Sequence, residues 1–452
     1  MGRETTVNSL ISTAQSVLEA NDLGDMIKPA AQLYPHQWLW DSALTAIGLA
    51  HLDWHRATAE IEHLFKGQWR EGNNAGFLPH IRFNPQAEGY FPGPDVWASE
   101  RFSGLARVCT SGITQPPIVA DAAWRLFQMR PSEQSGYNFL RRVYTPLTAY
   151  HRWLKRARDP LDKGLLFIAH PWESGLDNSP QFDEPLQGIA NIPDEVRELV
   201  DARRLDSRII SAAQRPTQGD YYCYIYLAVA YREMGYNWAE VFRYGEFGVQ
   251  EVAFNAIWCR SNRSLAAIAR LLGEVDDAAM FAAWADQTHQ AVNERLWNPD
   301  RGMYNSFDLR SNQRLQVDTI VAFLPLFAGI PDERQAELLL AHLTAEDEFN
   351  LPYPVPTTSR REATFDPDKY WRGPSWVVTN WFIIRGLEQY PGPCREFGQY
   401  LRSKTLRMTE QSGFWEYFNP LTGEGHGTKS YSWSAALAID LLTYHTSGGS
   451  GL

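Results

Sequence analysis

Apolar residues recur along most of the chain at the spacing of an α-helix. From Val7 to Leu18 they follow steps of three, one, three, three and one residues, which keeps them on one helix face. The same spacing, or a continuous apolar run, predicts further helices over 41–52, 56–66, 117–129, 138–156, 221–234, 249–271, 275–296, 318–328, 332–344, 375–389, 395–408 and 431–444. No long stretch alternates apolar and polar residues as a half-buried strand does. The sequence therefore predicts an all-α protein.

The predicted helices are of two kinds. Those over 275–296 and 395–408 carry a polar face, whereas those over 221–231, 318–328 and 431–442 are apolar on nearly every side, which indicates complete burial. Roughly a dozen helices that alternate between half-exposed and buried are typical of two concentric rings. We therefore predict an (α/α)6 barrel. A stacked helical solenoid is the alternative, but it would leave a fixed-period repeat that this sequence lacks.

Glycine and proline residues predict where several of these helices begin and end. Asn298-Pro299 is expected to close one helix, and Gly373-Pro374 is expected to open another with proline in its first turn. Pro325 is expected to kink or end the helix over 318–328, because proline lacks the N–H that a helix interior uses.

Three long connections interrupt the helical pattern. They are rich in Gly, Pro and aromatic residues, and connections of this length are usually functional. They cover residues 67–115, 159–193 and 345–373. With short strands over Gly164–Ala169 and Gly413–Phe418, they are expected to form a cap over the barrel face that holds the active site. No linker divides the chain, so residues 1–446 are expected to form one catalytic domain, followed by a flexible tail at 447–452.

The overall charge of the chain is acidic. Its 452 residues include 42 Lys and Arg against 53 Asp and Glu, which gives a formal net charge of −11. An acidic surface disfavours nucleic acid and anionic membrane surfaces, both of which attract basic faces. The longest apolar runs fall well short of the ~20 residues that span a bilayer, and the first residues lack the layout of a secretory signal. We expect a cytoplasmic protein without nucleic-acid or membrane partners.

Common nucleotide-binding, metalloprotease and serine-hydrolase motifs are missing from the sequence. The four cysteines, Cys109, Cys223, Cys259 and Cys394, lie far apart, so we expect buried free thiols rather than disulfides or a zinc site. No metal site is predicted.

The 17 Trp, 20 Tyr and 22 Phe are the unusual part of the composition. Their rings could fill a helical core or stack against sugars, and composition alone does not separate the two.

Carboxylates set among aromatic residues are the remaining candidates for chemistry. Glycoside hydrolysis needs one carboxylic acid to protonate the leaving oxygen and a second carboxylate to activate water or attack carbon. Aromatic walls raise the pKa of an acid by excluding water, and their faces hold the sugar. Four segments place a charged residue beside Trp or Tyr, namely Tyr34–Asp41, Pro171–Pro180, Tyr370–Trp376 and Phe414–Pro420.

Each of these acids also has a plainer interpretation. Asp177 could belong to a turn before a helix capped by Ser179, and Glu173 could be a partner behind the site or a surface charge. Asp41 could simply complement a helix dipole. Glu416 is harder to explain, because a carboxylate between aromatic residues is costly without a partner or a function.

Taken in order, these segments resemble glycoside hydrolase family 63, and within it the bacterial mannosylglycerate and glucosylglycerate hydrolases. The resemblance extends from about residue 34 to residue 440. It rests on an ordered series of motifs, which are Gln37–Ser42, Thr110–Pro117, Glu173–Pro180, Tyr370–Pro374 and Glu416–Gly423.

The resemblance implies an (α/α)6 barrel that hydrolyses an α-glycosidic bond with inversion and without a cofactor. By motif position, Asp177 would be the general acid and Glu416 the general base. In inverting enzymes the two carboxyl groups stand ~6.5–9.5 Å apart, with room for the attacking water. The wall of the sugar pocket would be formed by Tyr34, Trp40, Asp41, Tyr370, Trp371 and Trp376.

Within this family, substrate specificity depends on the aglycone, the part of the substrate attached to the sugar. A glycerate carboxylate would need a cation, and a guanidinium binds carboxylates with two prongs. Arg215 is the candidate for this cation. Its plainer interpretation is a surface arginine in a loop. Further substrate-binding candidates are Tyr221, Tyr90, Gln115 and His80. The segment Gly427–Trp433 departs from the family pattern, which leaves the roles of Lys429 and Tyr431 open.

The leading hypothesis is an inverting α-glycosidase that releases a hexose from glucosylglycerate or mannosylglycerate. The alternative is an α-glucosidase for neutral gluco-oligosaccharides. Two further hypotheses rank below these. One is a sugar 2-epimerase that uses His80, His170 and His426, and the other is a sugar-binding protein without catalysis. The sequence leaves open glucose against mannose, the oligomeric state and the loop that moves when substrate binds.

Overall fold

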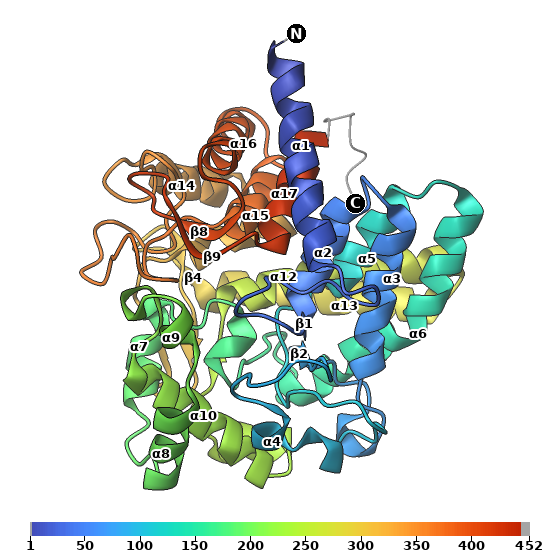
Figure 1. The fold of residues 1–452 in the computed structure, drawn as a ribbon, viewed down its shortest axis with the longest axis vertical. Helices are drawn as coiled ribbons and strands as arrows, with labels where there is room; N and C mark the ends of the chain where they lie inside the picture. Colours follow the sequence, from blue (N-terminus) through green and yellow to red (C-terminus); the bar gives the residue numbers. More distant parts are fainter. Residues whose placement is uncertain (1, 444–452) are drawn as a thin grey trace.

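The computed structural model describes residues 2–443, so the tail predicted for 447–452 lies outside the described residues. The chain is mostly helical (Figure 1). The α-helices are α1 (Gly2–Asn21), α2 (Leu39–Leu49), α3 (Trp54–Leu64), α4 (Pro94–Trp97), α5 (Val119–Gln128), α6 (Glu133–Arg158), α7 (Asp183–Gln187), α8 (Asp194–Arg203), α9 (Asp206–Ile209), α10 (Gln218–Glu233), α11 (Trp238–Tyr244), α12 (Val252–Leu272), α13 (Val275–Ala291), α14 (Glu333–Thr344), α15 (Val377–Leu387), α16 (Pro393–Ser412) and α17 (Ser432–Thr443).

Six helical segments form a closed circuit of neighbours. In order they are α2, α5, α12, the 3-10 helix η8 (Ile320–Ala328), α15 and α17, and α17 returns to pack against α2. A second helix packs on each of five members of this circuit: α3 on α2, α6 on α5, α13 on α12, α16 on α15 and α1 on α17. Helix α14 contacts η8 and α16. The more apolar helices are therefore covered by the amphipathic ones.

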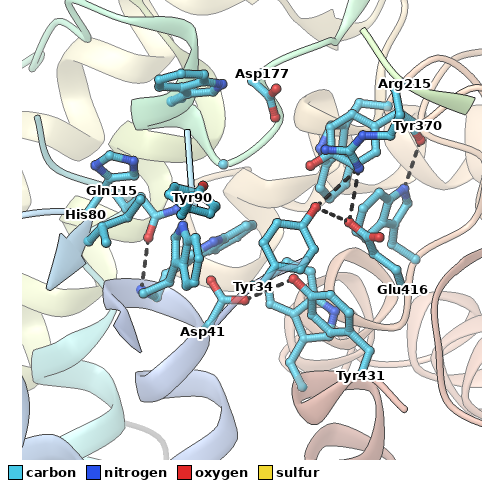
Figure 2. Close-up of a pocket in the computed structure, with 18 of the residues that line it drawn as sticks. Tyr34, Asp41, His80, Tyr90, Gln115, Asp177, Arg215, Tyr370, Glu416 and Tyr431 are labelled. Atoms are coloured by element: carbon cyan, nitrogen blue, oxygen red, sulfur yellow. Dashed lines mark hydrogen bonds and ion pairs between the residues drawn. The ribbon is translucent and has the colours of Figure 1, made fainter. Parts of the chain in front are cut away.

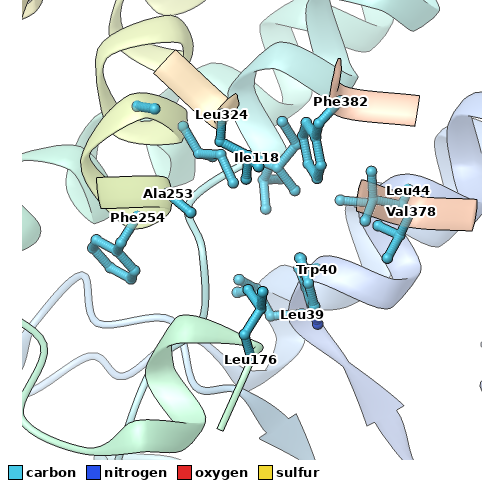
Figure 3. Close-up of a cluster of buried hydrophobic side chains, with 14 of the residues drawn as sticks. Leu39, Trp40, Leu44, Ile118, Leu176, Ala253, Phe254, Leu324, Val378 and Phe382 are labelled. Atoms are coloured by element: carbon cyan, nitrogen blue, oxygen red, sulfur yellow. The ribbon is translucent and has the colours of Figure 1, made fainter. Parts of the chain in front are cut away.

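The interior of this circuit is filled by apolar side chains (Figure 3). Leu44 of α2, Leu324 of η8 and Phe382 of α15 point toward one another there, together with Ile118 at the start of α5. All four are fully buried. Burial of a large apolar side chain contributes about 1.5–3 kcal/mol, so this cluster holds the helices whose ends carry the site.

Local sequence signals fix several helix starts. Thr217 accepts the backbone N–H of Asp220, whose carboxylate accepts the N–H of Thr217, and this capping box begins α10. Asp332 and Gln335 make the same arrangement at α14. These caps satisfy backbone donors that a helix N-terminus leaves free.

The strands are short and lie between the helices. Antiparallel pairs are formed by β1 (Gln37–Trp38) with β2 (Ile81–Arg82), β4 (Trp297–Asn298) with β5 (Met303–Tyr304), and β8 (Trp415–Phe418) with β9 (Gly425–Lys429), while β3 (Val249–Gln250), β6 (Phe307–Asp308) and β7 (Gln313–Arg314) make a three-stranded sheet. In the longest hairpin Tyr417 lies opposite His426, with an irregularity between Trp415 and Tyr417. The strand predicted near 413–418 is therefore confirmed. The strand predicted over Gly164–Ala169 is wrong, since only Ile168 makes a bridge there, to Val249.

Two predictions about helix type and ends are corrected. The segment predicted as a helix over 318–328 is buried on every side, as expected, but it forms the 3-10 helix η8 with Pro325 inside it. Proline has no N–H to donate, which disfavours a continuous α-helix here. Pro374 does not lie in a first helical turn, because α15 begins at Val377. Ser375 is extended instead and exchanges backbone hydrogen bonds of 2.8 and 2.9 Å with Phe418.

Other boundaries differ by small amounts. The helix predicted over 275–296 is α13 followed by a π-turn at Val292–Leu296, and Asn298 lies in β4 rather than at the helix end. The predicted long connections contain short helices, and α8 and α11 were not predicted. Cys223, Cys259 and Cys394 are buried free thiols as expected, whereas Cys109 is only half-buried.

Several segments outside the helix circuit gather at one end of the molecule. Helix α10 contacts both α4 and α8 there, and Figure 1 shows α7 to α10 with α4 and the β1–β2 pair in the lower part of the view. Among residues 2–443, no helix combines the length and apolarity needed to cross a bilayer.

Candidate active site

Asp177 follows a short 3-10 helix, Pro171–Ser174, that a buried ion pair anchors. Within it Glu173 accepts Nη2 of Arg158 at 2.5 Å and the backbone N–H groups of Thr114 at 3.1 Å and Ala169 at 2.7 Å. Both charged side chains are fully buried. Glu173 is therefore a partner behind the site, and its interpretation as a surface charge is wrong. The anchored turn fixes the backbone from which Asp177 projects.

The Asp177 carboxyl group lies in a buried environment. Burial raises its pKa to about 7, with Arg215 opposing the rise and the Glu416 and Asp206 charges adding to it. Ser179 stands at the cap position of the next 3-10 helix, but its hydroxyl makes no capping hydrogen bond. A carboxyl group that holds its proton near neutral pH is suited to act as a general acid.

Glu416 lies on β8 and is surrounded by donors. Its Oε1 accepts the hydroxyl of Tyr34 at 2.7 Å, and its Oε2 accepts the backbone N–H of Thr428 at 3.0 Å. Nη1 of Arg215 lies 3.6 Å from Oε1. Burial raises the pKa of Glu416, while Arg215 and the Tyr34 hydrogen bond act in the opposite direction. These contacts favour the carboxylate form that a general base needs.

Strand β9 comes close to the Glu416 carboxylate at Gly427. Gly427 has φ +73°, and a Cβ on it would lie 2.4 Å from Oε2 of Glu416. Glycine tolerates both this backbone conformation and this approach. Its absence of a side chain lets the neighbouring Thr428 N–H reach the carboxylate.

Asp177 and Glu416 line the same cavity, which Figure 2 shows with Asp41, Tyr34 and Arg215 around the open space between them. The cavity contains all thirteen residues named from the sequence, which are Tyr34, Trp40, Asp41, His80, Tyr90, Gln115, Asp177, Arg215, Tyr221, Tyr370, Trp371, Trp376 and Glu416. It also contains residues that were not assigned to it, notably Trp38, Trp172, Tyr431 and Trp433. The first two belong to segments already singled out for their aromatic content.

The floor of the cavity carries a third acid. Asp41 lies in the first turn of α2, and the hydroxyl of Tyr431 donates to its Oδ1 at 3.2 Å. Burial raises the pKa of Asp41 to about 8. Asp41 is thus both near a helix N-terminus and inside the cavity, and Tyr431 gains a defined contact. Lys429 instead lies outside the cavity, with its Nζ 5.8 Å from the Trp415 ring centre.

Aromatic rings form one wall. Trp371 and Trp376 stack with ring centres 3.5 Å apart, and Tyr417 also stacks against Trp376, with ring centres 4.8 Å apart. Tyr370 has the rare φ of +39°, and its carbonyl accepts Nε1 of Trp376 at 3.1 Å. A stack held in this way offers flat apolar surface beside the acids.

Arg215 is buried, with 4% of its surface exposed, so its interpretation as a surface arginine is wrong. Its Nη1 donates to the hydroxyl of Tyr34 at 3.2 Å. Gln115 accepts the backbone N–H of Trp40 at 3.4 Å. Tyr222, next to Tyr221, points elsewhere and donates to Asp201 at 2.6 Å.

The three histidines of the epimerase alternative do not share the cavity. His80 lines it, and its Nδ1 lies 2.5 Å from the hydroxyl of Ser111. His170 lies behind it, where burial lowers its pKa to about 3 and Nε2 bonds the carbonyl of Tyr224. His426 lies 3.0 Å from Asp368 and does not line the cavity. In the described part of the chain, no group of three or more His, Cys, Asp or Glu side chains is placed to hold a metal ion.

Paired buried carboxyl groups beside aromatic rings are the arrangement that glycoside hydrolases use, and comparison with known proteins indicates the same class. The domain family described as mannosylglycerate hydrolase MGH1-like glycoside hydrolase matches residues 34–434. The mannosylglycerate hydrolase of Thermus thermophilus is 40% identical over 426 residues, covering 94% of this chain and 99% of that protein. The glucosylglycerate hydrolase of Mycolicibacterium hassiacum is 35% identical over 460 residues, covering 97% and 98%.

A solved structure is also similar over nearly the whole chain. The crystal structure of a family 63 mannosylglycerate hydrolase from Thermus thermophilus, in complex with Tris and D-glycerate, matches with a TM-score of 0.87 at 39% identity, covering 95% of this chain and 99% of that one. The chain belongs to the MGH1-like glycoside hydrolases of family 63.

Proposed function

We propose that this protein is an inverting α-glycosidase that releases a hexose from glucosylglycerate or mannosylglycerate. The observation that carries the proposal is the contrast between its two cavity acids. Burial favours the protonated form of Asp177, while Tyr34, Thr428 and Arg215 surround Glu416 with donors. Relatives named for both substrates, at 40% and 35% identity, support the substrate class.

The proposed reaction uses the two acids in turn on one bond. Asp177 gives its proton to the glycosidic oxygen as the bond from the anomeric carbon to that oxygen breaks, so the aglycone leaves as an alcohol. Glu416 takes a proton from a water molecule whose oxygen forms the new bond to the anomeric carbon from the opposite face. The products are glycerate and a hexose of inverted configuration. Two proton transfers balance the addition of one water.

The aglycone is proposed to reach the cationic side of the cavity. Arg215 uses Nε and Nη1 for its contacts within the described residues, with Asp206 and Tyr34 as partners, and Nη2 is left for a ligand carboxylate. Tyr90 and Tyr221 line the same side of the site and also line the cavity next to it. A neutral glucoside would bring no carboxylate to Nη2 of Arg215.

We also infer that the closed helix circuit is the inner ring of an (α/α)6 barrel. Its six members and the six helices outside them, α1, α3, α6, α13, α14 and α16, match the number and alternation of that architecture. The contact of α17 with α2 argues against a stacked solenoid, whose first and last helices stay apart. The long connections and short strands then form the cap on the face that carries the cavity.

Proton NMR of fresh reaction mixtures tests the function directly. Incubation with glucosylglycerate and mannosylglycerate should release free hexose from at least one, with the β-anomer appearing before mutarotation. A neutral gluco-oligosaccharide is the comparison substrate. Faster release from the neutral substrate would support the alternative glucosidase, conversion between free hexoses would support an epimerase, and an α-anomer as first product would refute inversion.

The roles of the acids are tested by Asp177→Asn and Glu416→Gln. Each removes one proton transfer that contributes about 10²–10⁴-fold, so turnover should be lost while the far-UV circular dichroism stays that of the wild type. Near-normal rates in either folded variant would refute its assignment. Asp183→Asn is the control, because Asp183 pairs with Arg372 outside the cavity lining.

A further inference from the structure

A second ion cluster lies directly behind the cavity, in the segment between α8 and α10. Asp206 is 5% exposed and accepts three bonds from two arginines. Nε of Arg204 lies 2.7 Å from its Oδ1 and Nη2 lies 3.2 Å from its Oδ2, a two-pronged pair, while Nε of Arg215 lies 3.1 Å from the same Oδ2. Such geometry fixes a carboxylate more tightly than a single contact does.

Arg204 is itself held on its remaining sides. Its Nη2 also donates to the carbonyl of Pro216 at 2.6 Å, and its Nη1 donates to Gln218 at 3.0 Å. Its guanidinium lies 3.8 Å over the ring of Tyr221, a cavity residue. Arg204 therefore links Asp206 to the start of α10 and holds the Asp206 carboxylate in a fixed position.

Arg215 lies between this fixed point and the proposed general base. Its Nε end binds Asp206, whereas Nη1 stands 3.6 Å from Oε1 of Glu416, beyond a normal hydrogen bond. Its guanidinium lies 4.2 Å over the ring of Tyr370. A free arginine beside a buried glutamate would close onto it in a two-pronged pair. Two contacts hold this gap open: the Tyr34 hydroxyl lies between Nη1 and Oε1, and Asp206 holds the Nε end of the guanidinium from the other side.

We propose that Asp206, held by Arg204, is a positioning residue that draws Arg215 back from Glu416 and so keeps that carboxylate free to accept a proton from water. A carboxylate has about four lone-pair sites. Tyr34 and Thr428 already donate to Glu416, so two guanidinium bonds added to theirs would leave no site free to accept a proton from water. This inference rests on the proposed roles of Asp177 and Glu416 and adds a residue that lies behind the cavity and reaches it through Arg215.

The same cluster sets the electrostatic balance of the cavity. The Asp206 charge favours the protonated form of Asp177, and Arg215 disfavours it. Arg215 also opposes protonation of Glu416. Removal of Asp206 leaves Arg215 uncompensated, whereas removal of the Arg204 charge strengthens the compensation. The other ionisable groups that line the cavity are Asp41, His80, Tyr34, Tyr90, Tyr221, Tyr370 and Tyr431.

The test measures kcat and kcat/KM of the whole enzyme against pH for Asp206→Asn and Arg204→Gln, with the glycoside that the wild type hydrolyses fastest. In Asp206→Asn both limbs of the kcat/KM profile should move toward acid by roughly one pH unit. Its kcat should fall about ten- to a hundredfold, because Arg215 closes onto Glu416. In Arg204→Gln both limbs should move toward higher pH.

Opposite displacements distinguish positioning from a purely structural role, which would lower stability or rate in both variants and leave both limbs in place. Unmoved limbs, or limbs that move the same way, would overturn the inference. If one variant does not fold, the direction of the other decides. Asp347→Asn is the control, because Asp347 is an exposed acid whose ion-pair partner is Arg361, and neither residue lines the cavity; its profile should match the wild type.

The outcome is separable from that of the proposed function. Active Asp177→Asn or Glu416→Gln protein refutes the proposed catalytic roles themselves. Inactive catalytic variants, combined with unmoved limbs in Asp206→Asn and Arg204→Gln, refute only the positioning role of Asp206.

Discussion

At the scale of single residues, the proposed mechanism gives opposite tasks to two similar carboxyl groups, Asp177 and Glu416. Burial raises the pKa of both, but Glu416 has a hydroxyl, a backbone N–H and a guanidinium around it, whereas burial carries the pKa of Asp177 to about 7. The acid must be protonated and the base ionised. The rate should therefore fall as the pH rises through about 7, where Asp177 loses its proton, and fall on the acid side as Glu416 gains one.

Tyr34→Phe tests the donor that contacts Glu416 at the shortest distance. The lost hydroxyl gives up a 2.7 Å hydrogen bond that favours the carboxylate, so the pKa of Glu416 should rise. The acid limb of kcat/KM should move to higher pH, and kcat should fall about tenfold, as a hydrogen bond to a charged group is worth about 1.5–3 kcal/mol. Initial rates between pH 4 and 9 measure both effects.

A matched control exists outside the cavity. Tyr226 also donates to a glutamate, Glu246, at 2.7 Å, so Tyr226→Phe removes the same kind of bond at a place remote from the site. Its pH profile should be that of the wild type. An unmoved acid limb in Tyr34→Phe, or an equal shift in both variants, would contradict the role given to the Tyr34 hydroxyl.

The sequence makes some of these residues recognisable and hides others for a physical reason. Asp177 and Glu416 stand beside aromatic or glycine residues in stretches without helical spacing, which marks an acid that no helix surface explains. Asp206 has polar and apolar neighbours of ordinary kind, and its meaning comes only from Arg204 and Arg215 meeting it in space. Trp433 was not predicted as a cavity residue because it lies inside an apolar helical run, where an aromatic side chain is expected to belong to the hydrophobic core.

At the scale of elements, the site depends on helices that approach one another closely. Helix α2 carries Asp41 and packs against α17, whose first residues follow Tyr431. The two helices meet at Gly48, where a Cβ would lie 1.9 Å from the backbone oxygen of Ala436. No side-chain rotation can relieve a contact with backbone. The same two helices bring Asp41, at the start of α2, to the Tyr431 hydroxyl just before α17.

Gly48→Ala should separate the two helices and destabilise the protein. Overpacking costs typically about 1–3 kcal/mol, and the backbone contact places this site at the upper end. Urea unfolding followed by circular dichroism measures the loss. Gly219→Ala is the control, since a Cβ there would meet only Thr217 Oγ1 at 3.7 Å, and its midpoint should be unchanged or slightly higher. Equal stability of Gly48→Ala and the wild type would contradict the close crossing.

Element type follows the sequence where many residues contribute to one pattern. Helices such as α6 and α12 repeat their apolar spacing over several turns, and their existence was predicted. Strands of two residues, such as β1 and β2, are too short to alternate and leave no such signal. Around Pro325 and Pro374, tertiary contacts determine the local structure. The segment that contains Pro325 forms a 3-10 helix, whereas Ser375, next to Pro374, pairs with Phe418 instead of entering α15.

At the scale of the whole molecule, the cavity joins segments from almost the entire chain, between Tyr34 and Trp433. The mostly helical class could be predicted, because the apolar spacing of most segments has the helical period. The particular pair of helices that closes the circuit, α2 and α17, could not be found in this way, since the two lie nearly 400 positions apart and their contact leaves no periodic trace. Asn21, at the end of α1, reinforces this closure by donating to the carbonyl of Ser430 at 2.8 Å.

A ligand in such a cavity should therefore stabilise the molecule as a unit. In Glu416→Gln, glucosylglycerate at one hundred times its Kd should raise the free energy of unfolding by about 2.7 kcal/mol, which for a chain of this size shifts Tm by about 3 °C. Scanning calorimetry should show the whole transition moving, and an equal concentration of sorbitol should not reproduce the shift. If only part of the calorimetric transition moved, the segments from Tyr34 to Trp433 would not unfold as one unit. That result would contradict the view that the shared cavity links the N-terminal and C-terminal segments of the protein.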